Sequence, residues 1–286
     1  MQDGIAIAIS SGGFRGVFAQ GVLSAFEGRI AADAFGCASS SVVSGTLAAI
    51  GRSRSHGLDY WQRAAAKSET MGMSDVILTS IAEHDPDIRA AAFRPGSPRL
   101  LIAVSRVTTP EAAAKTQSDG AKRLGRKLLI QAARGDTSWV DTNLAKEIFD
   151  TAATGNRKLD AGNSDQVSYA STRMLHEWDI PAEIDGEPYI DASYTCSCPV
   201  FDLVERGYRD VIVIDPSPGD IYDSIFRQRL VRDGEQDGSR IHLIKPAIDT
   251  KDIGVDYTKA TRQGIQDGYD LGVKAGDAFL AGFLSR

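Results

Sequence analysis

The sequence is poor in cysteine, with only Cys37, Cys196 and Cys198 among its 286 residues. Such a sparse and odd-numbered set does not resemble a disulfide framework. Cys196 and Cys198 stand two positions apart, but the four histidines do not have the spacing that would complete a metal site with them. We therefore interpret the cysteines as small buried side chains. The sequence predicts neither a metal site nor a cofactor.

Long apolar runs and an excess of positive charge are missing as well. No uninterrupted apolar run approaches the roughly 20 residues that a membrane-spanning helix needs. Residues 1–9 lack the basic start and the longer apolar core of a signal peptide. The net charge of −6 does not suggest a nucleic-acid partner. With 42% hydrophobic and 24% charged residues, the composition is ordinary for a soluble protein, and we expect a cytoplasmic location.

No linker rich in Pro, Ser or Gly divides the chain, which predicts a single domain over residues 1–286. Helical spacing over residues 14–27 and 42–50 is closed by Gly28 and Gly51. Short apolar runs suited to buried strands cover residues 5–9, 34–38, 100–104, 167–170, 211–214 and 241–244. This alternation predicts a three-layer α/β/α fold with a mainly parallel central sheet.

Between residues 67 and 165 the pattern weakens and polar residues dominate. We expect a variable loop or cap region there, because such loops commonly build the mouth of a site. Residues 122–130 form a basic amphipathic segment within it. This segment is either a solvated helix face or a surface for transient contact with an anionic membrane.

A serine-rich turn, Cys37-Ala38-Ser39-Ser40-Ser41, joins a predicted strand to a predicted helix. A sharp elbow of this kind exposes a nucleophilic serine and leaves the next backbone N–H at a helix N-terminus, pointing at the developing charge. Positions two before and two after the nucleophile are usually glycine, and neither Cys37 nor Ser41 has glycine's freedom at positive φ. We favour Ser39 over Ser40 and Ser41 as the nucleophile, because this register begins the helix at Ser41-Val42.

The loop Ser11-Gly12-Gly13-Phe14-Arg15-Gly16 follows the first predicted strand and opens a helix. Its backbone amides can gather around an anion. With Asp33 downstream, the loop also partly matches a dinucleotide-binding fingerprint, but Ser11 stands where that fingerprint needs its first glycine. A dinucleotide site would leave unexplained both the serine turn and a lone acid in Tyr189-Ile190-Asp191-Ala192-Ser193, where Asp191 could serve as a base for the serine. We therefore rank it below serine-dependent hydrolysis.

Together with Asp191-Ala192-Ser193, the loop and the turn resemble, in order, the motifs of the patatin-like phospholipase family. That family combines a Gly-rich oxyanion loop ending in Arg-Gly, a Gly-x-Ser-x-Gly elbow, and an Asp-Gly-Gly or Asp-Gly-Ala motif. The similarity extends over most of the chain, through residues 167–171, 186–191, 199–200, 207–213 and 268–269. Four glycines of the family motifs are replaced, by Ser11, Cys37, Ser41 and Ala192.

The resemblance implies a patatin-like fold and a serine acyl hydrolase that cleaves acyl esters of phospholipids or lysophospholipids. It implies Ser39 as the nucleophile and Asp191 as the base of a dyad without histidine. The implied oxyanion donors are the amides of Gly12, Gly13, Phe14 and Ser40. Arg15 either neutralises a substrate phosphate or braces the loop by pairing with an acid, and both roles stay open at this point.

Two alternatives accompany this hypothesis. The four lost glycines are consistent with a degenerate relative that binds lipid or an anion without turnover. An acyltransferase would use the same covalent intermediate as a hydrolase. The sequence leaves the acyl chain length, the headgroup, the positional preference and the oligomeric state undetermined.

Overall fold

The computed structural model describes residues 2–83 and 90–285, and its main feature is a nine-stranded sheet. The strand order is β10-β11-β7-β1-β2-β3-β6-β5, and β4 also pairs with β3. The strands are β1 (Gln2–Ile9), β2 (Ala32–Ala38), β3 (Arg99–Val107), β4 (Leu144–Asp150), β5 (Ala182–Ile184), β6 (Glu187–Ile190), β7 (Tyr208–Ile214), β10 (Gly234–Gln236) and β11 (Ser239–Ile244). Strands β8 (Ile221–Tyr222) and β9 (Leu230–Val231) form a small separate sheet.

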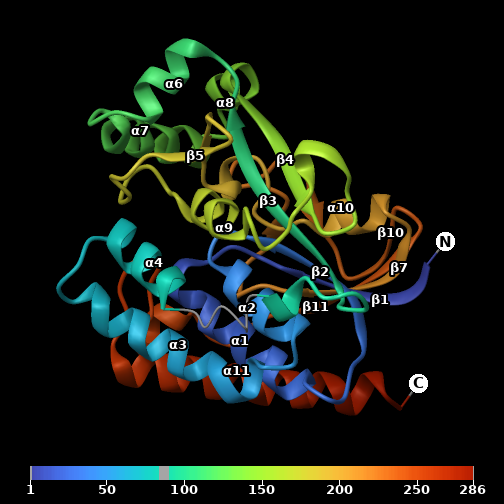
Figure 1. Cartoon of the computed structure of the whole chain (residues 1–286). Helices are drawn as coiled ribbons and strands as arrows, with labels where there is room; N and C mark the ends of the chain where they lie inside the picture. The colour runs from blue at the N-terminus through green and yellow to red at the C-terminus, as the bar shows by residue number, and fades with distance from the viewer. Residues whose placement is uncertain (1, 84–89, 286) are drawn as a thin grey trace.

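Five neighbouring strands of the large sheet, β11, β7, β1, β2 and β3, run parallel. Helices cover both faces, as Figure 1 shows, so the expected three-layer α/β/α fold with a mainly parallel sheet is confirmed. The helices are α1 (Val17–Phe26), α2 (Ser41–Ala49), α3 (Ser53–Ser68), α4 (Met73–Ala82), α6 (Pro110–Thr116), α7 (Ala121–Ala133), α8 (Ser138–Asn143), α9 (Ser164–Thr172), α10 (Val200–Glu205) and α11 (Arg262–Phe283). None of the described helices has both the length and the apolar character needed to cross a membrane.

The two faces of the sheet are sorted by the alternation of side chains along each strand. On β1, Ile7 and Ile9 join the larger hydrophobic core, which contains residues of α1 and α11. Ala6 and Ala8, which alternate with these isoleucines, belong to a second core with residues of α10 on the other face. A strand buried on both faces reads as a continuous apolar run, which is why residues 5–9 were recognisable as a strand.

The predicted strand over residues 167–170 is wrong, because these residues lie in helix α9. Val167, Ala170 and Ser171 are buried at helical spacing, and the Ser168 hydroxyl donates to the Ser164 carbonyl one turn earlier. A mostly apolar segment of only four residues, here Val-Ser-Tyr-Ala, does not distinguish a buried strand from a buried helix.

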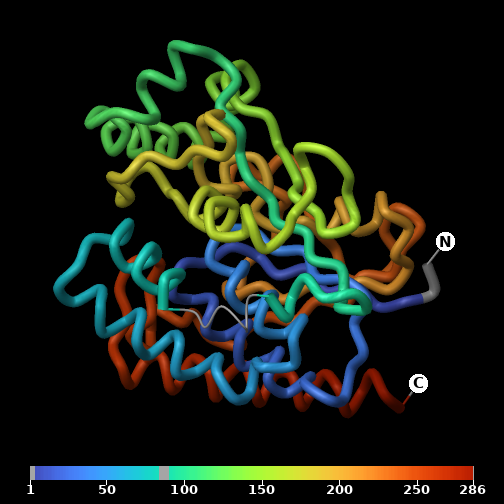
Figure 2. Tube along the Cα trace, in the orientation of Figure 1, coloured from blue at the N-terminus to red at the C-terminus, as the bar shows by residue number. Residues whose placement is uncertain are grey.

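The region over residues 67–165 contributes both to the sheet and to the layer above it. Strands β3 and β4 belong to the large sheet, and Figure 2 shows the green segment that carries α6, α7 and α8 on the far side of the sheet from α1 and α11. The basic segment of the sequence is helix α7, whose residues Arg123, Arg126 and Lys127 are exposed while Leu128 is fully buried. The helix is therefore amphipathic, as the spacing of its residues predicts.

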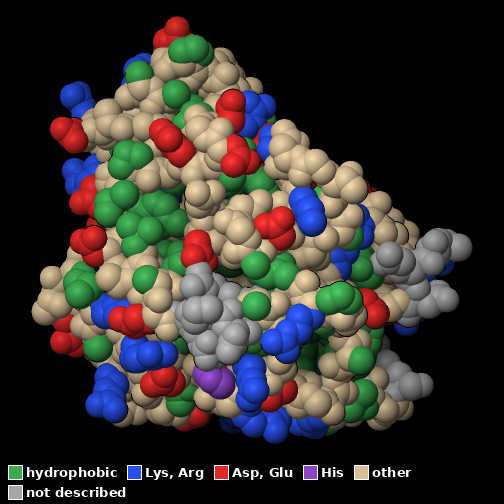
Figure 3. Space-filling model, in the orientation of Figure 1, with side chains coloured by type: hydrophobic (Ala, Val, Ile, Leu, Met, Phe, Trp, Pro, Cys, Tyr) green, Lys and Arg blue, Asp and Glu red, His purple; other side chains and the backbone are tan. Residues whose placement is uncertain are grey.

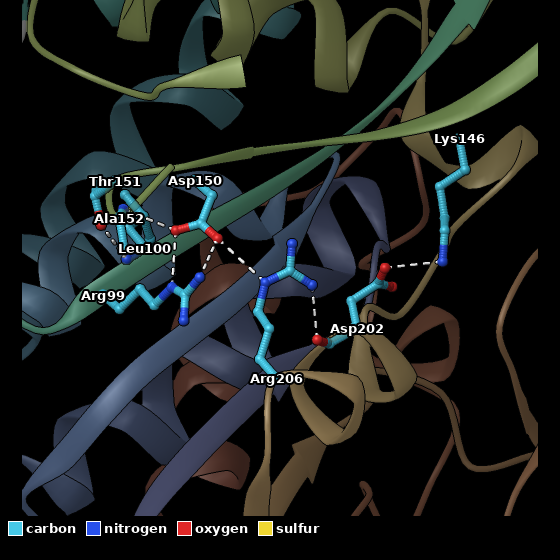
Figure 4. Close-up of polar contacts among 8 residues, drawn as sticks. All are labelled: Arg99, Leu100, Lys146, Asp150, Thr151, Ala152, Asp202 and Arg206. Atoms are coloured by element: carbon cyan, nitrogen blue, oxygen red, sulfur yellow. Dashed lines mark hydrogen bonds and ion pairs between the residues drawn. The ribbon is translucent and has the colours of Figure 1, made fainter. Parts of the chain in front are cut away.

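A group of ion pairs ties strands β3 and β4 to helix α10 (Figure 4). The buried Asp150 carboxylate accepts hydrogen bonds from Arg99 at 2.6 and 2.8 Å and from Arg206 at 3.1 Å. Burial opposes ionisation of Asp150, but the hydrogen bonds from Arg99, Ala152 and Arg206 and the charge of Arg99 together outweigh it, and the pKa of this carboxyl is lowered. Lys146 of β4 forms a further 2.8 Å pair with Asp202 of α10. These contacts hold the antiparallel strand against the parallel part of the sheet.

Candidate active site

Ser39 occupies a sharp turn between β2 and α2. Its φ is +55°, a left-handed conformation that is uncommon for residues other than glycine. The Ser39 amide donates a 2.8 Å hydrogen bond to the hydroxyl of Ser171 on α9, and that hydroxyl donates to the carbonyl of Ala103 on β3, also at 2.8 Å. A strained backbone of this kind persists where surrounding contacts hold it, and such residues cluster at functional sites.

The three consecutive serines of the turn have different surroundings. The Ser39 hydroxyl donates a 2.7 Å hydrogen bond to Oδ2 of Asp191. The Ser41 hydroxyl accepts from the Ala38 amide at 2.8 Å and lies 2.9 Å from the Ile9 carbonyl oxygen, so it links the ends of β1 and β2. No described residue pairs with the buried Ser40 hydroxyl. Ser39 is thus the serine of this turn that meets an acid, in the register favoured from the sequence.

Cys37 and Ser41, which lack glycine's freedom at positive φ, do not need it here, because neither residue has a positive φ. The positive φ falls on Ser39 itself, whereas Cys37 lies within β2 and Ser41 is the first residue of α2. The Cys37 thiol fills space beside Gly45, where an added Cβ would lie only 2.1 Å from the sulfur. Gly45 thus makes room for the larger side chain at position 37.

Asp191 is fully buried directly after β6, and its backbone and side chain are both held in place. Its amide donates to the Arg173 carbonyl at 2.9 Å, and its own carbonyl accepts from the Ser105 hydroxyl at 2.8 Å. Oδ1 accepts from the Ser193 amide at 2.7 Å, which leaves Oδ2 for Ser39. The carboxylate is therefore oriented before any substrate arrives.

Burial changes the acidity of this carboxyl. Removal from water raises the pKa of Asp191 to about 6, although the hydrogen bonds from Ser193 and Ser39 act in the opposite direction. An ordinary aspartate, with a pKa of about 4, is a poor base at neutral pH. The raised pKa makes Asp191 a stronger base that is still ionised above neutrality, as proton removal from a hydroxyl requires.

The glycine-rich loop lies next to the chain segment around Tyr257. Gly13 has a φ of +55°, and a Cβ at this position would lie 1.9 Å from the Tyr257 carbonyl oxygen, so no larger residue fits. The same carbonyl accepts a 3.0 Å hydrogen bond from the Phe14 amide. The predicted role of Phe14 as an oxyanion donor is therefore wrong, because its N–H is already bound.

The other three predicted oxyanion donors differ from Phe14. In the described part of the chain, no group accepts a hydrogen bond from the amide of Gly12, Gly13 or Ser40. Gly12, Gly13 and Ser39 line one cavity, and Gly13, Ser39 and Ser40 line the next. These amides are available to an anion beside the nucleophile.

The ion pairs of Arg15 argue against a role for this residue in substrate binding. Its buried guanidinium pairs with Asp249 at 3.2 Å and with Asp256 at 3.0 Å, and it lies 4.2 Å from the centre of the Tyr257 ring. Of the two roles left open by the sequence, the structure supports the bracing of the loop.

Asp33 is poorly placed to bind a ribose beside the glycine loop. It lies at the start of β2, where Ala32 pairs with Ile5, whereas the loop follows Ile9, which pairs with Cys37. Asp33 therefore lies near the amino ends of the parallel strands, and Gly12 lies beyond their carboxyl ends. The two residues cannot bind one dinucleotide together, so the dinucleotide interpretation does not fit the structure.

Two cavities meet at Ser39, and both are also lined by Gly13 and Trp178. The larger has a volume of about 590 Å³ and reaches Asp191, Ser193 and the loops after β7 and β8. The smaller has a volume of about 40 Å³ and apolar walls. Its apolar lining comes from Phe14, Val42, Val43, Tyr60, Trp61, Ala64, Met73, Val76, Ile77, Ile81 and Trp178. Figure 3 shows apolar side chains gathered between the parts of the surface that carry α7 and α4, and each of these helices lines one of the cavities.

Asp215 is a residue of the larger cavity that the sequence analysis missed. It directly follows β7, and its Oδ1 accepts a 2.7 Å hydrogen bond from the Ser217 amide. Burial raises the pKa of Asp215 to about 6. A signal was available, because Asp215 follows a buried parallel strand just as Ser10 and Ser39 do, and ligands bind beyond the carboxyl ends of such strands.

No protein-family model matches the chain, and no curated protein matches it significantly. The geometry around Ser39 and Asp191 is therefore the basis on which a function can be inferred.

Proposed function

We propose that the protein is a serine-dependent carboxylic ester hydrolase with Ser39 and Asp191 as a catalytic dyad, acting on acyl esters of lipids. The observation that carries the proposal is the 2.7 Å hydrogen bond from the Ser39 hydroxyl to the buried Asp191 carboxylate. A serine hydroxyl becomes a useful nucleophile when a base within hydrogen-bond reach takes its proton. The dyad provides that pairing with a carboxylate instead of a histidine.

In the acylation step, Ser39 Oγ attacks the ester carbonyl carbon and its proton passes to Oδ2 of Asp191. The carbonyl oxygen becomes an oxyanion, for which the unpaired amides of Gly12, Gly13 and Ser40 are the donors. The tetrahedral intermediate then collapses, the bond to the alcohol oxygen breaks, and Asp191 returns the proton to the leaving alcohol. The product of this step is an ester of Ser39.

Deacylation repeats these transfers with water. Asp191 takes a proton from a water molecule that attacks the acyl carbon, and it then returns that proton to Ser39 Oγ as the acid leaves. An alcohol in place of water would give acyl transfer, so analysis of products formed with added alcohols separates the hydrolase from an acyltransferase.

The two cavities support division of the ester between them. The smaller cavity has apolar walls beside Ser39, which suit the acyl group. The larger cavity contains the polar groups, which suit the alcohol. Ser39 stands where the two meet, so the scissile carbonyl would lie at the junction.

Labelling with a fluorophosphonate probe, followed by peptide mapping, tests the proposal directly. We expect modification at Ser39, and we expect Ser39→Ala and Asp191→Asn each to lower ester hydrolysis by about 10³-fold or more. Ser44→Ala is a matched control, because Ser44 is also a buried serine of this region and no described residue pairs with its hydroxyl. Full esterase activity in both dyad variants would disprove the proposal. If the folded protein is not labelled, a protein that binds lipid or an anion without turnover becomes the better hypothesis.

A further inference from the structure

The wall of the larger cavity is rich in hydroxyl groups. Besides Ser39, six serines line it: Ser10, Ser11, Ser193, Ser197, Ser217 and Ser224. They belong to separate parts of the chain, among them the end of β1, the turn after Asp191 and the loop after β8. The convergence of so many small polar side chains on one cavity indicates a ligand with several hydrogen-bonding groups.

Two of these serines, Ser10 and Ser224, have a buried hydroxyl oxygen for which the described residues provide no hydrogen bond. Ser224 is 2% exposed, and no described residue forms a hydrogen bond with its hydroxyl. A buried polar group normally has a partner, since an unpaired one costs free energy.

The charges around the cavity are mainly negative. Asp191, Asp215 and Asp220 line it with three carboxyl groups, while Arg227 is the single Lys or Arg among the described lining residues. Arg15, which the sequence offered as a phosphate ligand, is paired with Asp249 and Asp256 instead. A phosphate, with a charge of about −1.5 to −2, would be repelled by the carboxylates and would find few donors of opposite charge.

Carboxylates suit a neutral polyol for the same reason. An ionised aspartate is purely an acceptor, so it pairs well with ligand hydroxyl groups that donate. The Asp215 carboxylate already accepts from the Ser217 amide through Oδ1, which orients it at the wall. Serine hydroxyls beside it can both donate and accept.

The lining of the two cavities, together with their size, indicates which part of the ester enters each. A single water needs roughly 10–15 Å³ of free space in a cavity. The smaller cavity, with about 40 Å³ and mainly apolar walls, has few polar partners for a headgroup and space only for the first carbons of an acyl chain. The larger cavity, with about 590 Å³, has room for a branched polar headgroup.

We propose that the larger cavity binds the alcohol part of the ester, and that this alcohol is a neutral polyol such as glycerol or a sugar, not a phosphorylated headgroup. The inference rests on the proposed ester hydrolysis and names its substrate class. Asp215 and Asp220 are the specificity-determining residues, because their carboxylates accept from the polyol and repel a phosphate.

A matched set of esters with one acyl chain tests this inference on the full-length protein. The neutral members are 1-octanoylglycerol and 6-O-octanoylglucose, and the charged member is 1-octanoylglycerol 3-phosphate, all below their micellar concentrations. We expect kcat/KM for at least one neutral ester to exceed that for the phosphate ester by tenfold or more. Asp220→Asn, at an exposed position, should reduce this preference about threefold, and Asp215→Asn should reduce it at least as much.

Asp277→Asn is the control, since it removes one negative charge from α11, and Asp277 is not a lining residue of the larger cavity. It should leave the preference unchanged. A phosphate ester cleaved as fast as the neutral esters, or a preference that is insensitive to both cavity substitutions, would overturn the inference.

Hydrolysis of p-nitrophenyl octanoate separates this inference from the proposed function. If Ser39-dependent cleavage of that ester occurs and neither neutral octanoyl ester is cleaved, the polyol inference is wrong and the hydrolase proposal stands. If p-nitrophenyl octanoate is not cleaved and Ser39 is not labelled, the hydrolase proposal fails and the polyol inference fails with it.

Discussion

Ser39 and Asp191 lie 152 positions apart in the chain, yet the hydroxyl of one donates a 2.7 Å hydrogen bond to the carboxylate of the other. Ser39 follows β2 and Asp191 follows β6, and strand β3 pairs with both of these strands. The Ser105 hydroxyl of β3 also holds the carbonyl of Asp191. The distance between nucleophile and base is thus set by the packing of three strands.

The pH dependence of hydrolysis should follow the ionisation of Asp191. Burial raises the pKa of this carboxyl to about 6, and the base must be ionised to take the Ser39 proton. We expect kcat/KM to be level above about pH 7 and to fall about tenfold for each pH unit below about 6. Rates measured with a neutral ester from pH 4.5 to 9 check this. Asp215→Asn should keep the same acidic limb, whereas a level profile down to pH 4.5 would contradict the role of Asp191.

Asp191→Asn should make the protein more stable at alkaline pH while it removes activity. The pKa of Asp191 is about 6 in the folded protein, above its ordinary value, so the folded state holds the proton more tightly. Ionisation therefore costs stability as the pH rises from about 4 to about 6, and two pKa units correspond to about 2.7 kcal/mol. Asparagine carries no charge, so we expect a gain of about 1–3 kcal/mol at pH 8 and little change at pH 4. Urea unfolding at both pH values measures this, and an equal effect at the two would contradict it.

Gly13→Ala should destabilise the protein by about 2 kcal/mol or more, because it combines a strained φ with a steric clash. The φ is +55°, and the new Cβ would lie 1.9 Å from the Tyr257 carbonyl oxygen. Gly28→Ala is the matched control, since Gly28 also has a positive φ of +76° but no neighbouring atom of the described residues lies within 4 Å of the added Cβ. It should cost only about 1 kcal/mol. Similar unfolding free energies for the two variants would mean that the contact with Tyr257 is unimportant.

The thiol of Cys37 and the missing side chain of Gly45 should be energetically coupled. Gly45→Ala would place a Cβ 2.1 Å from the Cys37 sulfur, which overpacks the core and should cost about 1–3 kcal/mol. Cys37→Ala leaves a small cavity at a cost of about 1 kcal/mol. In the double variant the new methyl group occupies the space of the sulfur, so stability should recover by about 1 kcal/mol or more relative to the sum of the single changes. Additive effects in a denaturation cycle would refute the compensation.

Arg15→Met should lower stability without changing the selectivity between neutral and phosphorylated esters. The substitution leaves Asp249 and Asp256 without their largely buried cation, and we expect a loss of about 1–3 kcal/mol in unfolding free energy. The ratio of kcat/KM for the octanoylglycerol pair should stay constant. A selective loss of activity on the phosphate ester would restore the phosphate-binding role.

Much of the fold could be predicted because its signals are local. The five parallel strands contain short, mostly apolar and mostly buried stretches, and helices α1 and α2 have helical spacing that glycines close. The serine turn could be placed because small residues mark the change from strand to helix. The strand predicted over residues 167–170 was wrong because the four-residue segment Val-Ser-Tyr-Ala is too short to establish either period, and the packing of α9 against β3 decides for a helix.

By itself the sequence determined the parallel strands, the glycine loop and the serine elbow, since each depends on the periodicity and size of neighbouring residues. Only the tertiary structure decided which serine meets an acid, that Tyr257 occupies the Phe14 amide, that Arg15 pairs with Asp249 and Asp256, and that Asp215 faces the same cavity as Ser39. The physical reason is the range of the interactions. Burial, charge pairing and occupied amides depend on groups that the chain brings together from more than 100 residues away, and no local pattern records them.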